Sequence, residues 1–185
     1  MFGKLSIIGC GLIGSSILRA AQEKKLASKI SVYDNSNQVM EYLKKNFSVD
    51  ICSNLSETTK DADLIIISAP LSSYKEILLS IKPNLKDGSI LTDTGSAKKE
   101  VNKIVNNLGL KNISWIASHP IAGTEHSGPD AGFSSLFENK WCILSAANQV
   151  AKDKIENLKK FWSKLGSKVK IMSFEDHDYV LSLTS

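Results

Sequence analysis

Short apolar runs alternate along the chain with longer segments in which apolar residues recur every three or four positions. The runs have the length and composition of strands, and the longer segments have the period of amphipathic helices. Such alternation predicts an α/β domain with a mainly parallel sheet and helices on both faces. The predicted strands span residues 4–8, 30–34, 63–70, 89–93, 114–118, 141–145 and 168–172, and the predicted helices span 12–25, 37–45, 72–81, 97–108 and 152–165.

The strand at 63–70 is a continuous apolar run, which is typical of a central parallel strand covered on both faces. Ser68, Ala69 and Pro70 end it. We expect these three residues at the carboxyl edge of the sheet, where ligands bind in open α/β sheets, although a plain strand terminator would look the same. The strand at 168–172 alternates as an edge strand does. The pair His119 and Pro120 is expected to break the strand at 114–118.

Glycines interrupt the chain directly after the first strand, in the pattern G-x-G-x-x-G. Gly9 permits a tight turn, Gly11 lets a pyrophosphate approach the backbone, and Gly14 lets the following helix pack on the strand. A negative ligand would lie at the helix N-terminus. Leu12 and Ile13 complete the loop and are assigned to the same cofactor site. The pattern favours a Rossmann-type, doubly wound sheet.

Asp34 ends the second predicted strand and follows Gly14 by 20 positions, which is the usual offset of a ribose ligand. A carboxylate there accepts bonds from both ribose hydroxyls and repels a 2′-phosphate, and no cation follows it in Asn35, Ser36 or Asn37. The position therefore favours NAD over NADP. The alternative is that Asp34 merely caps the helix at 37–45.

Composition excludes several classes of protein. The 185 residues are 42% apolar, enough for one sizeable core. No stretch approaches the ~18 apolar residues of a membrane helix, so we expect no membrane partner and a cytoplasmic location. The net charge of +4 comes from lysines scattered among acids, which indicates no nucleic-acid partner. The cysteines, Cys10, Cys52 and Cys142, are too far apart for a metal motif and are expected to be buried free thiols.

Arg19 is the sole arginine, against 22 lysines obtained by subtracting it from 23 basic residues. Arginine is the residue that best clamps a carboxylate through two parallel hydrogen bonds. The chain therefore offers little besides lysine to hold a carboxylate substrate.

The candidate chemistry lies where later strands end. His119 precedes a proline, which favours an extended backbone and holds the ring at a strand end beside the expected nicotinamide. A neutral imidazole there can take a proton from a hydroxyl while hydride leaves the same carbon. Ser96 ends the strand before and can converge with it. A hydrogen-bonded structural histidine and a helix N-cap are the alternatives, and His126, in a long glycine-rich loop over 121–139 that we expect to be functional, competes with His119.

Several of these residues together resemble one family. Gly9-x-Gly-Leu-Ile-Gly-x-Ser16, Thr92-Asp-Thr-Gly-Ser-x-Lys98, His119-Pro-Ile-Ala-Gly-Thr-Glu-x-Ser-Gly128, Trp141 and His177-Asp178 look like the prephenate/arogenate dehydrogenases of tyrosine biosynthesis. The match covers nearly the whole chain, and the block from His119 to Gly128 is its most specific part.

The resemblance implies NAD-dependent oxidative decarboxylation of prephenate to 4-hydroxyphenylpyruvate, or of arogenate to tyrosine. His119 would accept the ring hydroxyl proton, and Ser96 would hydrogen-bond that hydroxyl or the histidine. Thr124 and Glu125 match the motif and would line the substrate pocket. His177 and Asp178 would begin an interdomain helix, with a structural role.

The resemblance also implies a helical C-terminal domain that dimerises and supplies an arginine to the substrate. We therefore expect an NAD-binding domain over 1–172, the start of an interdomain helix over 173–185, and a homodimer only when the C-terminal domain is present. A chain of this extent is expected to bind NAD and to turn over slowly or not at all.

Other functions stay open at this point. A different Rossmann reductase, of the hydroxy-acid or pyrroline-carboxylate type, is disfavoured by the block at His119. A non-catalytic NAD-binding module is the alternative from another class. Neither composition nor motif calls for a metal.

Overall fold

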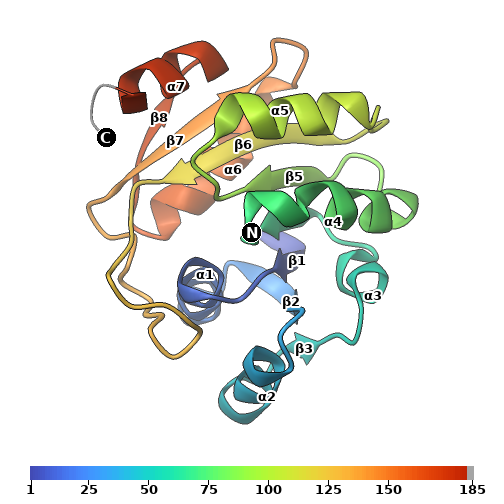
Figure 1. Ribbon diagram of the computed structural model, residues 1–185, viewed down its shortest axis with the longest axis vertical. Coiled ribbons are helices and arrows are strands. Elements are labelled where there is room, and N and C mark those ends of the chain that lie inside the picture. Colours follow the sequence, from blue (N-terminus) through green and yellow to red (C-terminus); the bar gives the residue numbers. More distant parts are fainter. Residues whose placement is uncertain (183–185) are drawn as a thin grey trace.

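The chain forms one twisted sheet with helices on both faces (Figure 1), as seen in a computed structural model that describes residues 1–182. Within this range the strands are β1 (Phe2–Ile8), β2 (Ala27–Tyr33), β3 (Asp50–Ile51), β4 (Leu64–Ile67), β5 (Ile90–Asp93), β6 (Ser114–Pro120), β7 (Trp141–Ala146) and β8 (Lys168–Ile171). The helices are α1 (Leu12–Glu23), α2 (Asn37–Asn46), α3 (Leu55–Thr59), α4 (Tyr74–Ile81), α5 (Lys98–Asn107), α6 (Lys152–Lys164) and α7 (Phe174–Ser182), with 3₁₀ turns η1 (Leu71–Ser73) and η2 (Lys82–Asn84).

The strand order is β3-β2-β1-β4-β5-β6-β7-β8. All neighbouring strands run parallel except β6 and β7, which pair antiparallel. The chain therefore starts in the middle, winds outward through β2 and β3, and returns to the other side of β1 with β4. This reversal is the switch point at which open α/β sheets bind ligands. The predicted Rossmann-type, mainly parallel sheet is confirmed.

Two apolar layers hold the helices against the sheet. One face packs buried residues of α1 and α6 on β1, β4 and β7, among them Ile17, Leu158 and Trp162. The other face packs α4 and α5 on β4 and β5 through residues such as Leu78 and Val101. Alternate residues of β4 serve the two layers, because successive side chains of a strand point to opposite faces. Its complete burial confirms that the 63–70 run contains a central strand, and β8 lies at the sheet edge as its alternation predicts.

The expected strand break at His119 and Pro120 is wrong, because β6 continues through Pro120. The reason is the pairing with β7, which places His119 opposite Ile143. The amide of the next residue, Ile121, donates to the Trp141 carbonyl. Successive amides of a strand point to opposite sides, so an amide at position 120 would face β5. Pairing of β5 with β6 covers only positions 114 and 115 on β6, so proline removes no ladder hydrogen bond.

Smaller elements also differ from expectation. The strand β3 and the helix α3 are two and five residues long and were not predicted. Helix α5 has Ala97 as its N-cap residue, so Ser96 is not its cap. Helix α7 begins after Ser173, whose hydroxyl accepts from the Asp176 amide. Positions 183–185 of the predicted interdomain helix lie outside the described residues.

The cysteines, the long loop and the lengths of the helices also bear on what the sequence predicts. The cysteines are free and buried, as predicted. The segment from 121 to 140 contains neither helix nor strand, which confirms the long loop. Over residues 1–182, none of the helices has the length and apolar character needed to cross a membrane.

Candidate active site

The glycine loop between β1 and α1 has the geometry that its sequence predicts. Gly9 has a φ of 87°, and a Cβ there would lie 2.6 Å from the Ser68 carbonyl oxygen. A Cβ on Gly14 would lie 1.9 Å from the Gly9 carbonyl oxygen, so helix and loop pack backbone to backbone. Gly11, the N-cap residue of α1, has open space within 4 Å of the same position. The loop thus leaves free space at the N-terminus of α1, where backbone N–H groups attract an anion.

A cavity of about 510 Å³ opens beside this loop at the switch point of the sheet. It is lined by six of the nine residues predicted to bind the cofactor, namely Gly9, Gly11, Asp34, Ser68, Ala69 and Pro70. The other three, Leu12, Ile13 and Gly14, do not line it: Leu12 and Ile13 pack against the core, and Gly14 is buried under the loop. The lining contains two carboxylates, on Asp34 and Glu76, and no lysine or arginine.

Asp34 is fixed at the cavity by the backbone around it. Its carboxylate accepts hydrogen bonds from the amides of Cys10, at 2.7 Å, and Ser36, at 2.9 Å. The side chain that caps α2 is Ser36, which accepts from the Val39 amide. The alternative assignment of Asp34 as the cap of this helix is therefore wrong. Its carboxylate instead joins the end of β2 to the glycine loop.

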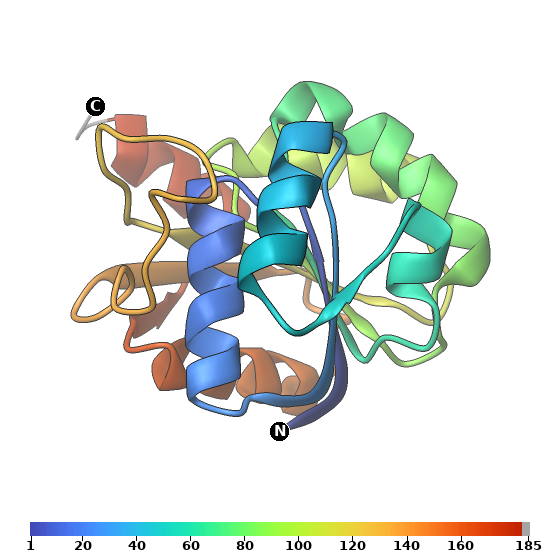
Figure 2. The same cartoon turned by 90° about the horizontal axis from the view of Figure 1, so that it is seen from below.

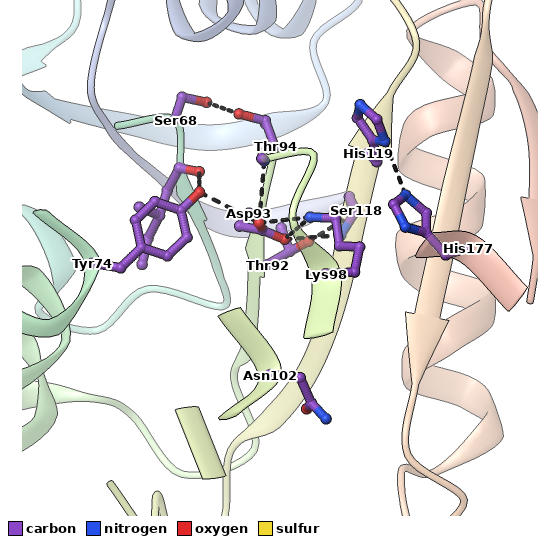
Figure 3. A network of polar contacts seen from close by, with 12 residues as sticks. Ser68, Tyr74, Thr92, Asp93, Thr94, Lys98, Asn102, Ser118, His119 and His177 are labelled. Atoms are coloured by element: carbon purple, nitrogen blue, oxygen red, sulfur yellow. Dashed lines mark hydrogen bonds and ion pairs between the residues drawn. The ribbon is translucent and has the colours of Figure 1, made fainter. Parts of the chain in front are cut away.

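A second polar centre lies where β5 and β6 end, around the fully buried Asp93 (Figure 3). Its carboxylate oxygens accept from the Lys98 ammonium at 2.7 and 2.6 Å and from the Ser118 amide at 3.1 Å. The Tyr74 hydroxyl and the Gly95 amide, at 3.3 and 3.1 Å, complete the shell. An ion pair buried this deeply is stable only when its remaining hydrogen-bonding capacity is satisfied. The network ties α4, α5 and β6 to the end of β5.

His119 stands on β6 one residue beyond Ser118 and is half-buried. Its Nδ1 lies 2.9 Å from Nε2 of His177 on α7, and the ring centroids are 5.1 Å apart. His177 is fully buried, and its Nδ1 lies 2.7 Å from Oδ1 of Asp178. Figure 3 shows the two imidazoles facing each other across the gap between β6 and α7.

Electrostatics keep His119 neutral. Burial, together with the nearby Lys98 and His177, lowers its pKa to about 4, and Asp178 only partly opposes them. An imidazole with this pKa is unprotonated at neutral pH and can accept a proton. Among the described residues, no group hydrogen-bonds to its Nε2, so the ring has one nitrogen held and one open.

The remaining predicted site residues lie on exposed segments. Ser96 is exposed and has no side-chain hydrogen bond to His119, whose Nδ1 faces His177 instead. Thr124, Glu125 and the competing His126 are all exposed in the 121–139 loop. There the Thr124 hydroxyl accepts from the His126 amide at 3.1 Å.

The 121–139 loop lies along α1 (Figure 2). The Phe133 amide donates to the Ser16 hydroxyl at 3.1 Å, and a Cβ on Gly132 would lie 2.1 Å from Oγ of Ser15. Arg19 reaches the same loop by donating to the Pro129 carbonyl at 3.2 Å. It also donates to the Tyr42 hydroxyl at 2.9 Å, and its guanidinium stacks 4.8 Å over the Phe47 ring. The sole arginine is thus engaged in holding the loop and α2 on α1.

Sequence reasoning missed four residues of this site. Asp93 and Lys98 lie within the motif 92–98, and only their buried ion pair shows what they do. His177 and Asp178 were expected to be structural, yet His177 contacts the ring of His119 directly. A His-Asp pair just after a helix cap was the available signal, but sequence spacing could not show that α7 returns to β6.

The fold and the glycine-lined cavity together define a Rossmann-type nucleotide-binding domain. Residues 17–171 match the family model described as prephenate dehydrogenase, nucleotide-binding domain. The chain therefore belongs to the prephenate dehydrogenase family.

Named relatives agree with this family. A cyclohexadienyl dehydrogenase of Zymomonas mobilis is 35% identical over 100% of this chain and 63% of its own, and a prephenate dehydrogenase of Lactococcus lactis is 33% identical over 98% and 50%. The crystal structure of Aquifex aeolicus prephenate dehydrogenase in complex with hydroxyphenyl propionate and NAD⁺ superposes with a TM-score of 0.86 at 27% identity, covering 98% of this chain and 63% of that one. The chain thus spans about half to two thirds of the length of these proteins.

Proposed function

We propose that this chain is the nucleotide-binding and catalytic-histidine domain of an NAD-dependent prephenate dehydrogenase. The reaction is the oxidative decarboxylation of prephenate to 4-hydroxyphenylpyruvate. The observation that carries the proposal is His119, a neutral imidazole with an open Nε2 at the same sheet edge as the glycine-lined cavity. Relatives named prephenate dehydrogenase support the choice of substrate over arogenate.

The residues around the cavity fit NAD. The open space at Gly11 and the N-terminus of α1 suit its pyrophosphate, and the fixed Asp34 carboxylate suits two ribose hydroxyls. The lining has no lysine or arginine and so offers no cation to a 2′-phosphate. When bound, NAD supplies the acceptor for the hydride of the substrate's carbinol carbon.

The chain's own task is proton transfer and positioning. Nε2 of His119 takes the proton of the ring hydroxyl as the carbinol carbon is oxidised, which is general base catalysis. The carboxylate on the ring then leaves as carbon dioxide, and its bonding electrons complete the aromatic ring. The proton returns to the resulting phenolate. We propose that Ser96 hydrogen-bonds the substrate hydroxyl and that Thr124 and Glu125 line the substrate pocket.

The test uses the complete gene product with prephenate and NAD. His119→Asn should lower kcat by roughly 10²- to 10⁴-fold, the usual share of a general base, while calorimetry finds NAD binding unchanged. His126→Asn, a change in the exposed loop, is the matched control and should keep nearly full activity. An unchanged rate for His119→Asn would remove this residue from the mechanism. Faster turnover of arogenate than of prephenate would reassign the substrate.

The cofactor preference has its own test. Asp34→Asn should weaken NAD binding about tenfold or more, because hydrogen bonds to a charged group contribute roughly 1.5–3 kcal/mol. The same change should reduce the preference for NAD over NADP. Glu76→Gln removes the other carboxylate of the same cavity and should change NAD affinity little. A wild-type protein that uses NADP as well as NAD would contradict the role given to Asp34.

A further inference from the structure

Three side chains form a chain of hydrogen bonds that ends at the proposed base. Oδ1 of Asp178 lies 2.7 Å from Nδ1 of His177, and Nε2 of His177 lies 2.9 Å from Nδ1 of His119. We propose that His177 and Asp178 are positioning residues that fix the tautomer of His119, so that its proton stays on Nδ1 and its lone pair on Nε2. The catalytic part of this inference rests on the proposed function.

The direction of these hydrogen bonds follows from Asp178, the one member of the three that cannot donate. An ionised carboxylate only accepts hydrogen bonds, so Nδ1 of His177 must carry a proton. A neutral His177 then has its lone pair on Nε2. The facing Nδ1 of His119 must therefore donate. The tautomer of an imidazole is set by the bond that its other nitrogen makes, so Nε2 of His119 is left as the acceptor.

The Asp178 carboxylate is itself held in place by hydrogen bonds from backbone amides. Its Oδ1 also accepts from the Lys98 amide at 3.3 Å, and its Oδ2 accepts from the Lys99 amide at 3.1 Å. These are the first two amides of α5, whose N-cap residue Ala97 has no side-chain acceptor. Burial raises the pKa of Asp178, but the bonds from His177 and the Lys99 amide outweigh it and lower the pKa overall. The carboxylate is therefore ionised at neutral pH.

Lys98 is the charged group that lies beside the three hydrogen-bonded side chains. Lys98, buried and paired with Asp93, lies near His119 and lowers its pKa, while burial lowers the pKa of Lys98 itself against the opposing Asp93. Beside this group, the proposed order of donors requires a neutral His177. Were His177 an imidazolium, its Nε2 would donate to His119 and the proton of His119 would move to Nε2. The base would then be blocked, so the neutral state of His177 is the essential part of the arrangement.

The first experiment reads the tautomers without substrate. The three histidines of this chain, His119, His126 and His177, can each be assigned in long-range ¹H–¹⁵N spectra of the complete gene product with one variant that removes that histidine. We expect His119 and His177 both to carry the proton on Nδ1, with the exposed His126 as internal reference. Asp178→Ala removes the acceptor that holds the proton of His177 on Nδ1, so the proton of His119 should no longer be confined to Nδ1. A proton on Nε2 of His119 in the wild type would overturn the proposal.

The second experiment separates positioning from simple packing. His177→Gln can still accept from His119 through its amide oxygen and donate to Asp178, whereas His177→Leu fills similar space without an acceptor. We expect Gln to keep the Nδ1–H tautomer and kcat within about tenfold, and Leu to lower kcat roughly 10²-fold or more with little change in KM. Equal kcat and an unchanged tautomer in both variants would overturn the proposal. This pair also decides the matter if Asp178→Ala does not fold.

The two proposals fail in different ways. If the predicted tautomers are found but prephenate is not oxidised, the proposed function is wrong and the hydrogen-bonded chain stands. If prephenate is oxidised through His119 but the tautomers differ, only the positioning role is wrong.

Discussion

At the scale of single residues, Gly14 and Gly11 of the glycine loop differ in the space that is available to an added Cβ. Gly14 has the Gly9 carbonyl oxygen 1.9 Å from the position of an added Cβ, and Gly11 has open space. Gly14 is therefore a packing position, and Gly11 borders the open space proposed for the pyrophosphate.

Gly14→Ala should therefore lower the free energy of unfolding by roughly 1–3 kcal/mol, since overpacking forces backbone to move. Gly11→Ala is the matched control and should cost about 1 kcal/mol or less, from a poorer N-cap. Urea denaturation measures both free energies. Calorimetry should show that Gly11→Ala weakens NAD binding, because the added Cβ enters the space proposed for the pyrophosphate. Equal destabilisation by the two changes would show that the loop does not pack as described.

The lowered pKa of His119 links protonation to stability. Its folded pKa is about 4, and the unfolded value is near 6.5. Between these values the unfolded chain binds more protons, so stability rises with pH. The contribution is complete above pH 6.5 and is lost as the pH falls to about 4.

We predict that the difference in unfolding free energy between wild type and His119→Asn shrinks as the pH is lowered from 6.5 to 4. Urea denaturation across this range measures the difference, and taking the difference cancels the carboxylates that both proteins share. His126→Asn should run parallel to wild type. A constant difference would mean that the folded imidazole titrates normally.

At the scale of elements, Arg19 joins α1 to α2 and to the 121–139 loop through two donated bonds and a stacked ring. Lysine keeps the charge but has neither the planar fork nor the stacking surface.

Arg19→Lys should lower the free energy of unfolding by roughly 1–2 kcal/mol, the loss of about two net hydrogen bonds. It should also speed proteolysis within the 121–139 loop. Lys44→Arg, on the exposed face of α2, is a control that should change neither. An unchanged rate of proteolysis in Arg19→Lys would show that the contacts of Gly132 and Phe133 are enough to hold the loop on α1.

Elements also show where sequence reasoning stops. Periodicity identified β4, the glycine loop and the Asp34 position, because each depends on neighbours within about 25 residues. It could not find that β6 passes through Pro120, which depends on antiparallel pairing with β7. Nor could it find the cap of α5, which comes from Asp178, 80 residues after Lys98. Contacts of this separation leave no period in the sequence.

For the molecule as a whole, a line of buried hydroxyls joins the sheet to α6. Ser118 is 2.6 Å from the Thr92 hydroxyl and accepts from the Trp162 indole at 3.0 Å. On the adjacent strand, the buried Ser145 hydroxyl has no hydrogen-bond partner among the described residues. Both serines are buried, but only the Ser118 hydroxyl has hydrogen-bond partners among the described residues.

Ser118→Ala should cost roughly 1–3 kcal/mol of unfolding free energy, because it leaves the buried indole N–H of Trp162 without an acceptor. Ser145→Ala, its matched control, removes a hydroxyl that no group uses and should be neutral or slightly stabilising. Thermal and urea denaturation measure both. A neutral Ser118→Ala would show that Trp162 is held by packing alone.

The capping of α5 by α7 has a consequence for how the protein is made. Domains emerge from the ribosome N-terminal end first, so the glycine loop, Asp34 and β4 are released long before residue 178. His119 emerges without its ring partner, and α5 emerges without its cap. A growing chain can therefore complete the nucleotide cavity while the imidazole is still free to take either tautomer. In the proposed mechanism, His119 becomes competent as a base only when α7 has docked on β6.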